Sequence, residues 1–478
     1  MHFFVNKGMG HSNSGVEHAQ FYRAARFKES NLPFKYIFTD YLPQLHQHMS
    51  EWQIAENDVI GLYDFFLSDD PRQYLRDGEA FQHTYHEDVL YDTKGVQRLV
   101  IRQTTGNFKA TTYKKRFYDS STSREINVDH RVILKNGQHQ MSWHYLGTGS
   151  HKRMVNIHLN HFYEDDYFFA TYEALLLFFY QQLERVFHHN VYFIDRGSDN
   201  EEVLVQLKSQ QINLKIVAII HAAHFVSKQG GHLLWNNHYQ YLFDHLDQID
   251  AVVVSTMLQK QDILKQLAFL GNTNISDKLY VIPVGGVDRV PKARHLSGDA
   301  IRFVTASRLH AEKNISHIIL ALAQLQANGI SATLTIYGSG ADEQNIRRLI
   351  YDEQMTGSVK INGLSQNLSE ELQAYDAFVS ASYSEGFGLT YVEAMAQGLP
   401  IVSYQNSYGA QTLIRPNENG ILVPITDDKD KNVAALARAM RRLLTVYDTL
   451  SIGQQNVAKA FTNQQISTAW EKLVGDLR

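Results

Sequence analysis

The stretch Ser384 to Gln397, which reads S-E-G-F-G-L-T-Y-V-E-A-M-A-Q, decides the fold class of this chain. An apolar run from Ala377 to Ser382 comes directly before it and predicts a buried strand. Its second half predicts a helix from about Leu389 to Gln397, because Gly398 and Pro400 then end the helical pattern. The stretch is therefore a strand, a tight turn and a helix, the repeating unit of an α/β protein.

Two carboxylates flank the turn of this unit. Glu385 lies at the lip of the strand, and Glu393 lies about one turn into the helix. Between them, the turn offers backbone N–H groups at the positive end of a helix dipole, where a pyrophosphate or the polar edge of a sugar can bind. The context predicts a nucleotide-sugar site, with both carboxylates facing one cleft.

Apolar strands alternate with helical patterns on both sides of this unit, which predicts two doubly wound α/β domains that face each other. In the N-terminal part we expect strands at 3–5, 35–40, 58–65, 191–195, 215–221, 251–256 and 279–285, and helices that end near 29 and cover 168–187. In the C-terminal part we expect strands at 301–307, 332–338, 359–362, 377–382, 400–404 and 420–424. Since ligands of such sheets bind at the carboxyl ends of the strands, we expect a site in the cleft between the domains.

Short alternating runs from about Gln82 to Leu159 interrupt the first domain. Asn136-Gly137 is a strong hairpin signal, and the alternation predicts an antiparallel sheet. The expected hinge between the two α/β domains is the polar stretch Gly286 to Asp299. The predicted parts are a Rossmann-like domain of residues 1–67 and 188–288, a β-rich insertion of 68–187, a second Rossmann-like domain of 289–465, and a C-terminal helix of 466–478 that crosses back to the first domain.

Composition excludes several classes of protein. The net charge of -5 argues against a nucleic-acid binder held by phosphate neutralisation. Because the chain has no cysteine, disulfides, zinc thiolate sites and thiol nucleophiles are excluded. The longest apolar run, Ala174 to Tyr180, is far shorter than the roughly 20 residues that span a bilayer, and the N-terminus lacks a signal-peptide pattern. We expect a cytoplasmic protein with at most peripheral membrane contact.

Two cations follow a strand of the C-terminal domain. Arg308 and Lys313, in S-R-L-H-A-E-K, precede a helix that begins near Asn314. At such a position both side chains can sit beside a diphosphate. A single arginine after a strand is usually a surface charge. The presence of two cations here, with Glu385 at another strand end, favours a binding site.

Small turns follow the next two strands. Y-G-S-G, with Gly338 and Ser339, permits close approach of the backbone to a ligand, although an ordinary turn between strand and helix has the same pattern. N-G-L, with Asn362 and Leu364, is expected to supply backbone contacts to a flat base.

The N-terminal domain offers fewer signals. Gly10, Ser14 and Gly15 belong to a strand-glycine-helix turn that is not a dinucleotide fingerprint, and a P-loop lysine motif is absent. In H-A-A-H, His221 and His224 follow a strand, and His221 is the expected functional contact. No acidic cluster completes a metal site beside them, so no metal is expected.

These residues resemble the retaining GT-B glycosyltransferases that carry an E-x7-E element, here Glu385 to Glu393. Within them, the chain is similar to the GtfA group of the accessory Sec system glycosyltransferases, which modify Ser/Thr of serine-rich repeat adhesins in Gram-positive bacteria. The β-rich insertion looks like the extra domain of this group, which wall teichoic acid α-glycosyltransferases share. The stretches that carry the likeness are 13–24 (N-S-G-V-E-H-A-Q-F-Y-R-A), 219–224, 234–241, 281–285, 305–313, 336–340, 384–394 and 408–412.

The resemblance implies roles for matching positions. Arg308 and Lys313 would hold the UDP diphosphate and stabilise the leaving group, so that no metal is needed. Glu385 would contact the donor sugar beside His221, and Glu393 would bind the ribose. Further donor contacts are implied for Gly10, Gly338, Ser339, Asn362, Leu364, Gly386, Phe387, Gly388, Leu389 and Thr390, and an acceptor side for Ser14, Gly15, Glu17 and His224.

The resemblance also implies the reaction and leaves alternatives open. The first hypothesis is transfer of GlcNAc or glucose from its UDP donor to a Ser/Thr-rich protein, by front-face attack with retention, with a GtfB-like chain or another copy of this chain as partner. The second is glycosylation of a polyol-phosphate teichoic acid, which favours a basic groove such as Lys109 to Arg116. The third is a non-catalytic partner protein that only binds the substrate.

Overall fold

The computed structural model describes residues 1–11, 14–78, 86–91, 98–105, 108–119, 123–196, 199–229, 232–272, 275–296, 298, 300–365 and 367–478. The chain divides into two compact units. The first consists of Met1–Asn13, Leu32–Ala218 and His238–Asp250, and the second of Ser14–Asn31, Ile219–Asn237 and Ala251–Arg478. The domain boundaries expected from the sequence stay predictions.

A parallel sheet forms the centre of the first unit. Its strands lie in the order β12 (Lys215–Ile220), β11 (Val191–Ile194), β1 (His2–Asn6), β2 (Phe34–Phe38) and β3 (Val59–Gly61). Nearly every residue of these strands is buried, which explains why they are continuous apolar runs rather than alternating ones. Among the helices of this unit are α2 (Leu45–Glu51), α4 (Pro71–Asp77), α6 (Asp199–Ser209) and α7 (Gln240–Asp244).

Two expectations for this unit are wrong in part. The strand expected at 58–65 ends at Gly61, and Leu62–Leu67 form helix α3. The helix expected at 168–187 begins only at Tyr172, as α5 (Tyr172–Val186), because the preceding residues belong to a strand. Both segments are short and apolar, so their periodicity does not distinguish helix from strand. Packing decides: the ring of Phe65 lies 5.4 Å from that of Phe162 and 5.6 Å from that of Phe179.

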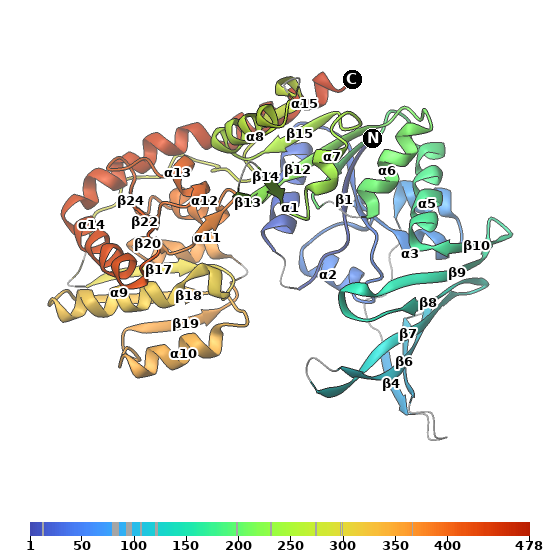
Figure 1. Cartoon of the computed structure of the whole chain (residues 1–478), viewed down its shortest axis with the longest axis horizontal. Coiled ribbons are helices and arrows are strands. Elements are labelled where there is room, and N and C mark those ends of the chain that lie inside the picture. The colour runs from blue at the N-terminus through green and yellow to red at the C-terminus, as the bar shows by residue number, and fades with distance from the viewer. Residues whose placement is uncertain are drawn as a thin grey trace. The chain divides into compact units, whose positions relative to one another are not determined.

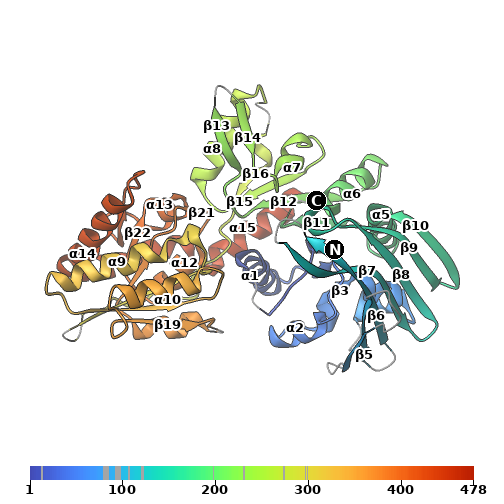
Figure 2. The same cartoon turned by 60° about the horizontal axis from the view of Figure 1, so that its bottom comes forward.

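The insertion is an antiparallel sheet, as expected, and Figure 2 shows its strands side by side. The hairpin predicted at Asn136-Gly137 is confirmed, since Asn136 pairs with His139 across the turn and Gly137 has a φ of 57°. The strand order is β10 (Asp165–Thr171), β9 (Arg153–Phe162), β8 (His139–Leu146), β7 (Arg124–Asn136), β6 (Phe108–Asp119), β5 (Arg98–Thr105) and β4 (His86–Tyr91).

The second unit contains another parallel sheet, in the order β19-β18-β17-β20-β22-β24 (Figure 1). Buried side chains alternate along its strands. Phe303 and Val379 join the cluster that α9 and α14 cover, whereas Val304 and Phe378 join the cluster that α12 and α13 cover. Helices therefore pack on both faces. The strands are β17 (Ile301–Ala306), β18 (Ala332–Tyr337), β19 (Val359–Gly363), β20 (Ala377–Ser380), β22 (Ile401–Tyr404) and β24 (Gly420–Val423); the helices are α9 (Ile315–Ala327), α10 (Glu343–Asp352), α11 (Leu368–Glu371), α12 (Leu389–Ala396), α13 (Gly409–Leu413) and α14 (Lys429–Ala458).

Elements from distant parts of the sequence complete the second unit. α1 (Gly15–Glu29) packs against α15 (Asn463–Asp476), where the Arg23 guanidinium lies 5.6 Å from the Trp470 ring and the Tyr22 hydroxyl donates to Asn463 Oδ1 at 2.5 Å. The hairpin of β13 (Phe225–Gln229) and β14 (His232–Trp235), the parallel pair β15 (Ala251–Val254) and β16 (Leu279–Val281), and α8 (Met257–Phe269) also belong to this unit.

Glu201 in α6 makes the stability of the protein depend on pH. Its side chain is buried, and its Oε2 atom has no hydrogen-bond partner among the described residues. Burial raises the pKa of this carboxyl from 4.5 to about 7. Because the folded state then binds the proton more tightly than the unfolded chain, stability falls as the pH rises from about 4.5 to about 7.

We expect Glu201→Gln to raise the melting temperature above about pH 7, with a gain of about 1–3 kcal/mol, because the amide carries no charge to bury. At about pH 5 the gain should largely vanish, since Glu201 is then protonated in the folded protein. Thermal unfolding of both proteins at the two pH values measures the difference. Glu202→Gln, at the exposed neighbouring position, is the matched control. An equal gain at both pH values would contradict the assignment.

Candidate functional site

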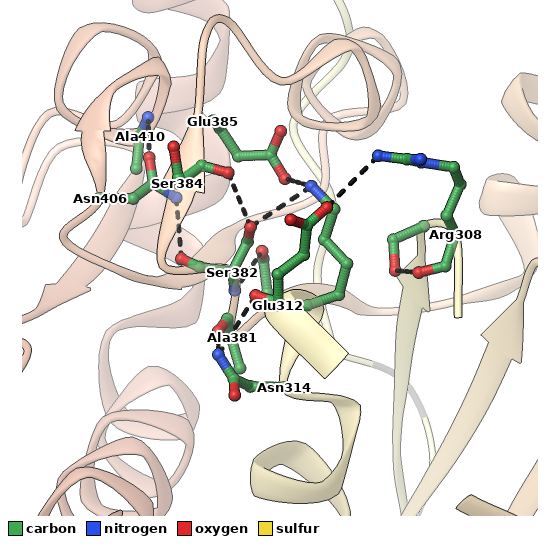
Figure 3. A network of polar contacts seen from close by, with 12 residues as sticks. Arg308, Glu312, Asn314, Ala381, Ser382, Ser384, Glu385, Asn406 and Ala410 are labelled. Carbon is green, nitrogen blue, oxygen red and sulfur yellow. Dashed lines mark hydrogen bonds and ion pairs between the residues drawn. The ribbon is translucent and has the colours of Figure 1, made fainter. Parts of the chain in front are cut away.

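An ion pair joins two strand ends of the second unit. Lys313 follows β17 and Glu385 lies in β21 (Ser384–Glu385), which follows β20. β17 and β20 are parallel neighbours, so their carboxyl ends lie at the same edge of the sheet. Lys313 Nζ donates to Glu385 Oε1 at 2.6 Å and to Ser382 Oγ at 3.4 Å (Figure 3). The lysine side chain is 12% exposed to solvent and the glutamate side chain 23%, so a ligand can reach the pair.

Buried and partly buried hydrogen bonds hold the loops that carry this pair. Asn314, in the left-handed region with a φ of 48°, donates from Nδ2 to the Ala381 carbonyl at 3.1 Å. Ser382 Oγ donates to the Ser384 carbonyl at 2.9 Å. The buried Asn406 donates from Nδ2 to the Ser382 carbonyl at 3.2 Å and accepts from the Ala410 N–H at 3.0 Å. The position of Glu385 is therefore set by side chains from several loops.

Arg308 lies in the same loop as Lys313 but points outward. Its side chain is 68% exposed and its Nη2 lies 3.3 Å from Glu312 Oε1 (Figure 3). Such an exposed pair contributes little to stability, so the guanidinium is free to exchange Glu312 for another anion. The structure thus places both predicted cations on one loop, with only Lys313 held in place.

The first predicted glycine turn touches the loop that carries Arg308, and the second turn is bonded to the first. Gly338 has a φ of 129°, and a Cβ atom there would overlap the Ser307 carbonyl oxygen. The Ser339 carbonyl accepts from the Leu309 N–H at 2.8 Å, and the Gly363 carbonyl accepts from the Gly338 N–H at 2.7 Å. The two neighbours of Gly363, Asn362 and Leu364, are exposed at the end of β19. The sheet therefore brings these four predicted residues to the edge that carries the ion pair.

The turn 386–388 is shaped by backbone contacts. A Cβ atom at Gly386 would overlap the carbonyl oxygen of His221, so H-A-A-H lies directly against this turn. Gly388 has a φ of 89° and lies against the Tyr391 ring. Phe387 is buried in the core, so its ring does not face a ligand. A ligand can therefore approach only the backbone of 386–388 in this turn. Helix α12 then begins with Leu389 and Thr390, which are both half-buried.

Glu393 is the carboxylate of α12 that the sequence singled out. It lies one turn after Leu389, and burial raises its pKa from 4.5 to about 7. Such a group changes its charge near neutral pH, which is characteristic of residues in binding and catalytic sites.

The two histidines of H-A-A-H differ. His221 is half-buried, whereas the side chain of His224 is fully buried, with Nε2 at 2.8 Å from Gln266 Oε1. Burial lowers the pKa of His224, so its imidazole is neutral at pH 7. The acceptor-side role of His224 stays a prediction, and its burial argues against direct contact with an acceptor.

Three other predicted residues lie at the start of α1. Ser14 is the N-cap: its hydroxyl accepts from the Val16 N–H at 3.3 Å, and Glu17 Oε2 accepts from the Ser14 N–H at 2.7 Å. This capping box explains the spacing of S-G-V-E. Gly15 has no other side chain near it, and Asn13 lies outside the described residues. The acceptor-side roles of Ser14, Gly15 and Glu17 stay predictions.

Gly10, the donor-side residue expected in the N-terminal domain, lies in the first unit. Its carbonyl accepts from the Trp52 Nε1–H at 3.2 Å, and a Cβ atom there would meet no neighbour. Contact of Gly10 with the donor stays a prediction.

Sequence reasoning missed Tyr408. It lies in β23 (Ser407–Tyr408), which pairs in parallel with β21, so Tyr408 is the register partner of Glu385. Its hydroxyl donates to Asp262 Oδ2 at 2.5 Å. The available signal was a tyrosine-glycine pair in the loop after a buried strand, and this pair was used only to support the resemblance.

Within the part of the chain that the structure describes, no three His, Asp or Glu side chains are grouped as metal ligands. No helix among the described residues is both long enough and apolar enough to cross a membrane.

Known proteins share this architecture. Residues 288–456 match the family model of glycosyl transferases group 1. The GtfA subunit of a UDP-N-acetylglucosamine–peptide N-acetylglucosaminyltransferase from Streptococcus gordonii is 27% identical, over 99% of this chain and 98% of its own. A poly(glycerol-phosphate) alpha-glucosyltransferase from Bacillus subtilis is 29% identical over 48% of this chain and 32% of its own.

Solved structures share the fold over the whole length of the chain. The pneumococcal O-GlcNAc transferase GtfA, solved with UDP and GlcNAc, has a TM-score of 0.74 at 24% identity and covers 100% of this chain and 98% of its own. A GtfA/B complex has a TM-score of 0.72 at 25% identity and covers 100% and 99%.

We expect Gly386→Ala to destabilise the second unit, because the added methyl group must separate the turn from the His221 carbonyl. Overpacking of this kind costs about 1–3 kcal/mol. Urea unfolding measures the loss. Gly357→Ala is the matched control, since its Cβ would meet nothing within 4 Å. Equal stability of the two variants would show that the close contact at Gly386 does not exist.

Proposed function

We propose that this chain, which has the GT-B fold, is a glycosyltransferase that transfers GlcNAc or glucose from a UDP-sugar to Ser/Thr side chains of a serine-rich surface protein. The match of residues 288–456 to the group 1 family model supports this class of reaction. The contact of Lys313 with Glu385 at the carboxyl edge of the sheet carries this proposal. It supplies a cation for the diphosphate and an acceptor for sugar hydroxyls within one hydrogen bond of each other.

Lys313 and Arg308 neutralise the departing UDP. Lys313 has three donor hydrogens, of which Glu385 and Ser382 use two in the structure. The exposed Arg308 turns from Glu312 to the diphosphate. Cations placed beside the leaving group stabilise its developing negative charge by several kcal/mol, so the proposed reaction needs no metal ion.

The transfer keeps the configuration at the anomeric carbon. The bond from this carbon to the UDP phosphate oxygen breaks, and the acceptor hydroxyl attacks from the same face. That phosphate oxygen takes the hydroxyl proton as the new glycosidic bond forms. Glu385 binds the hexose on one side and His221 contacts its other edge, so both residues orient the sugar and neither acts as a nucleophile. Choice of GlcNAc or glucose rests on the room around the 2-position.

A protein acceptor is supported by the GtfA relatives, which match the chain over its whole length. The GtfA/B complex supports a GtfB-like chain as partner, with a homo-oligomer as the other arrangement. The antiparallel insertion offers exposed apolar side chains and a sheet edge, which suit a partner or an extended peptide; among them are Phe117, Tyr118 and Leu146. We place the reaction in the cytoplasm, at or near the inner face of the membrane.

Glycosylation of teichoic acid is the second candidate, and the match to a poly(glycerol-phosphate) glucosyltransferase supports it. The basic run at 109–116 weakens it, because acidic residues of β7 neutralise part of that strand. Lys114 pairs with Asp129 at 3.2 Å, and Arg116 pairs with Glu125 at 3.0 Å. A groove for a polyanion requires an excess of positive charge along its length, which these two acidic residues reduce.

The decisive experiment offers the purified protein labelled UDP-GlcNAc or UDP-glucose with a Ser-rich peptide or with poly(glycerol phosphate). We expect transfer to the peptide, a loss of about 10²-fold or more in kcat for Lys313→Met, and a similar loss for Glu385→Gln. Lys360→Met, at an exposed position of β19, is the control. Transfer to the polyol phosphate alone would select the second candidate. No transfer by the wild-type protein to either acceptor would favour a protein that only binds substrate, and unchanged transfer by Glu385→Gln would remove Glu385 from the proposed site.

Glu393 predicts how donor affinity depends on pH. Its carboxylate accepts from the ribose hydroxyls in the proposed complex, and hydrogen bonds to the ionised form favour ionisation. Affinity therefore rises as the pH passes up through about 7, the pKa of the free enzyme, and then levels off. We expect KM for the UDP-sugar to fall about three- to tenfold between about pH 6 and about pH 8.5. Glu393→Gln should flatten this profile, whereas a constant KM in the wild type would contradict the role.

A further inference from the structure

Three polar side chains on one face of α8 hold loops of the site. Gln259 Nε2 donates to the Ala222 carbonyl at 2.8 Å, directly after His221. Asp262 Oδ2 accepts from the Tyr408 hydroxyl at 2.5 Å, and Gln266 Oε1 lies 2.8 Å from His224 Nε2. Spacings of three and four residues place these side chains on the same side of a helix. α8 thus holds H-A-A-H at two points and the loop after β22 at a third.

The loop after β22 supports Glu385. Tyr408 is the register partner of Glu385, and a Cβ atom at Gly409 would lie 3.1 Å from the Glu385 Cβ and would overlap the Phe387 carbonyl. Any movement of Tyr408 is therefore transmitted to the carboxylate that pairs with Lys313.

The backbone of Tyr408 is strained. Its φ of 67° and ψ of −75° lie in the region of the tight γ-turn, a backbone conformation that residues other than glycine rarely adopt. Strain of this kind costs on the order of 1–3 kcal/mol and persists only where surrounding contacts impose it. Asp262 supplies such a contact. Burial, with the charge of Asp262, raises the pKa of Tyr408, so its hydroxyl keeps the proton that it donates.

We propose that Tyr408 and Asp262 are positioning residues, whose hydrogen bond holds the strained loop beside Glu385 and thereby fixes Glu385 relative to His221. The inference rests on the proposed function for the meaning of this alignment. A displacement of about 1 Å in a reacting complex can lower a rate by about 10²-fold, whereas a partly exposed hydrogen bond adds little to overall stability. The pair should therefore affect turnover more than folding.

The kinetic test compares Tyr408→Phe, Asp262→Ala and the double variant. We expect each single variant to lower kcat about tenfold and to change KM for the UDP-sugar by less than about threefold. The double variant should lose no more than either single one, because both remove the same bond. Asp262→Asn should stay close to the wild type, since its amide oxygen still accepts from the tyrosine. Tyr404→Phe is the matched control: it removes a buried hydroxyl, bonded to His317, on the neighbouring strand.

A second measurement reads the loop itself and does not depend on activity. Because the chain has no cysteine, Ser407→Cys creates a single site for a spin label at an exposed position next to Tyr408. We expect a more mobile spectrum after Tyr408→Phe or Asp262→Ala, and an unchanged one after Tyr404→Phe or Asp262→Asn. Melting temperatures check that the variants are folded.

The outcomes separate this inference from the proposed function. Wild-type kcat in Tyr408→Phe, additive losses in the double variant, or a spin label that stays equally immobile would each overturn the positioning role. A wild-type protein that transfers no sugar from either donor would overturn the proposed function, while the spin-label comparison would still decide whether Asp262 holds the loop.

Discussion

The ion pair of Lys313 and Glu385 is the interaction on which the rest of the site depends. Neither charge is fully exposed, and a half-buried charge without a partner costs several kcal/mol. Each residue therefore makes the burial of the other tolerable. The neighbouring hydrogen bonds, from Asn314 to the Ala381 carbonyl and from Ser382 to the Ser384 carbonyl, keep the two loops in register so that the pair can form. A cation and a carboxylate at this edge are thus held in place before any ligand arrives.

Close backbone contacts give the site its shape. Gly386 lies against the His221 carbonyl, Gly338 against the Ser307 carbonyl and Gly409 against the Phe387 carbonyl. At each of these places a side chain would force two loops apart. The chemistry of the site is therefore built as much from the approach of backbone segments as from its charged side chains. α8 adds to this arrangement from the side of H-A-A-H, through Gln259 and Asp262.

The accuracy of the sequence interpretation followed the strength of the local signals. α12 was predicted to within one residue, because Gly398 and Pro400 mark its end without ambiguity. The buried strands of both units were recognised from apolar runs between glycines and polar loops. The interpretation was wrong at 62–65 and at 168–171, where apolar and aromatic residues fit a helix and a strand equally well. There the surrounding packing, which the local sequence does not contain, selects the conformation.

The alternation of strands and helices, and the approximate ends of most strands, can be read from the sequence. They place Arg308, Gly338, Asn362 and Glu385 at or just after the ends of the main strands. Those properties depend on local periodicity and turn residues, which can be read from neighbouring positions. Only the tertiary structure decided the partners: Lys313 meets Glu385 across 72 residues, and Tyr408 meets Asp262 across 146. Such contacts follow from strand order and from loops that approach within a hydrogen bond, and these are set by the packing of the whole unit rather than by any single stretch of chain.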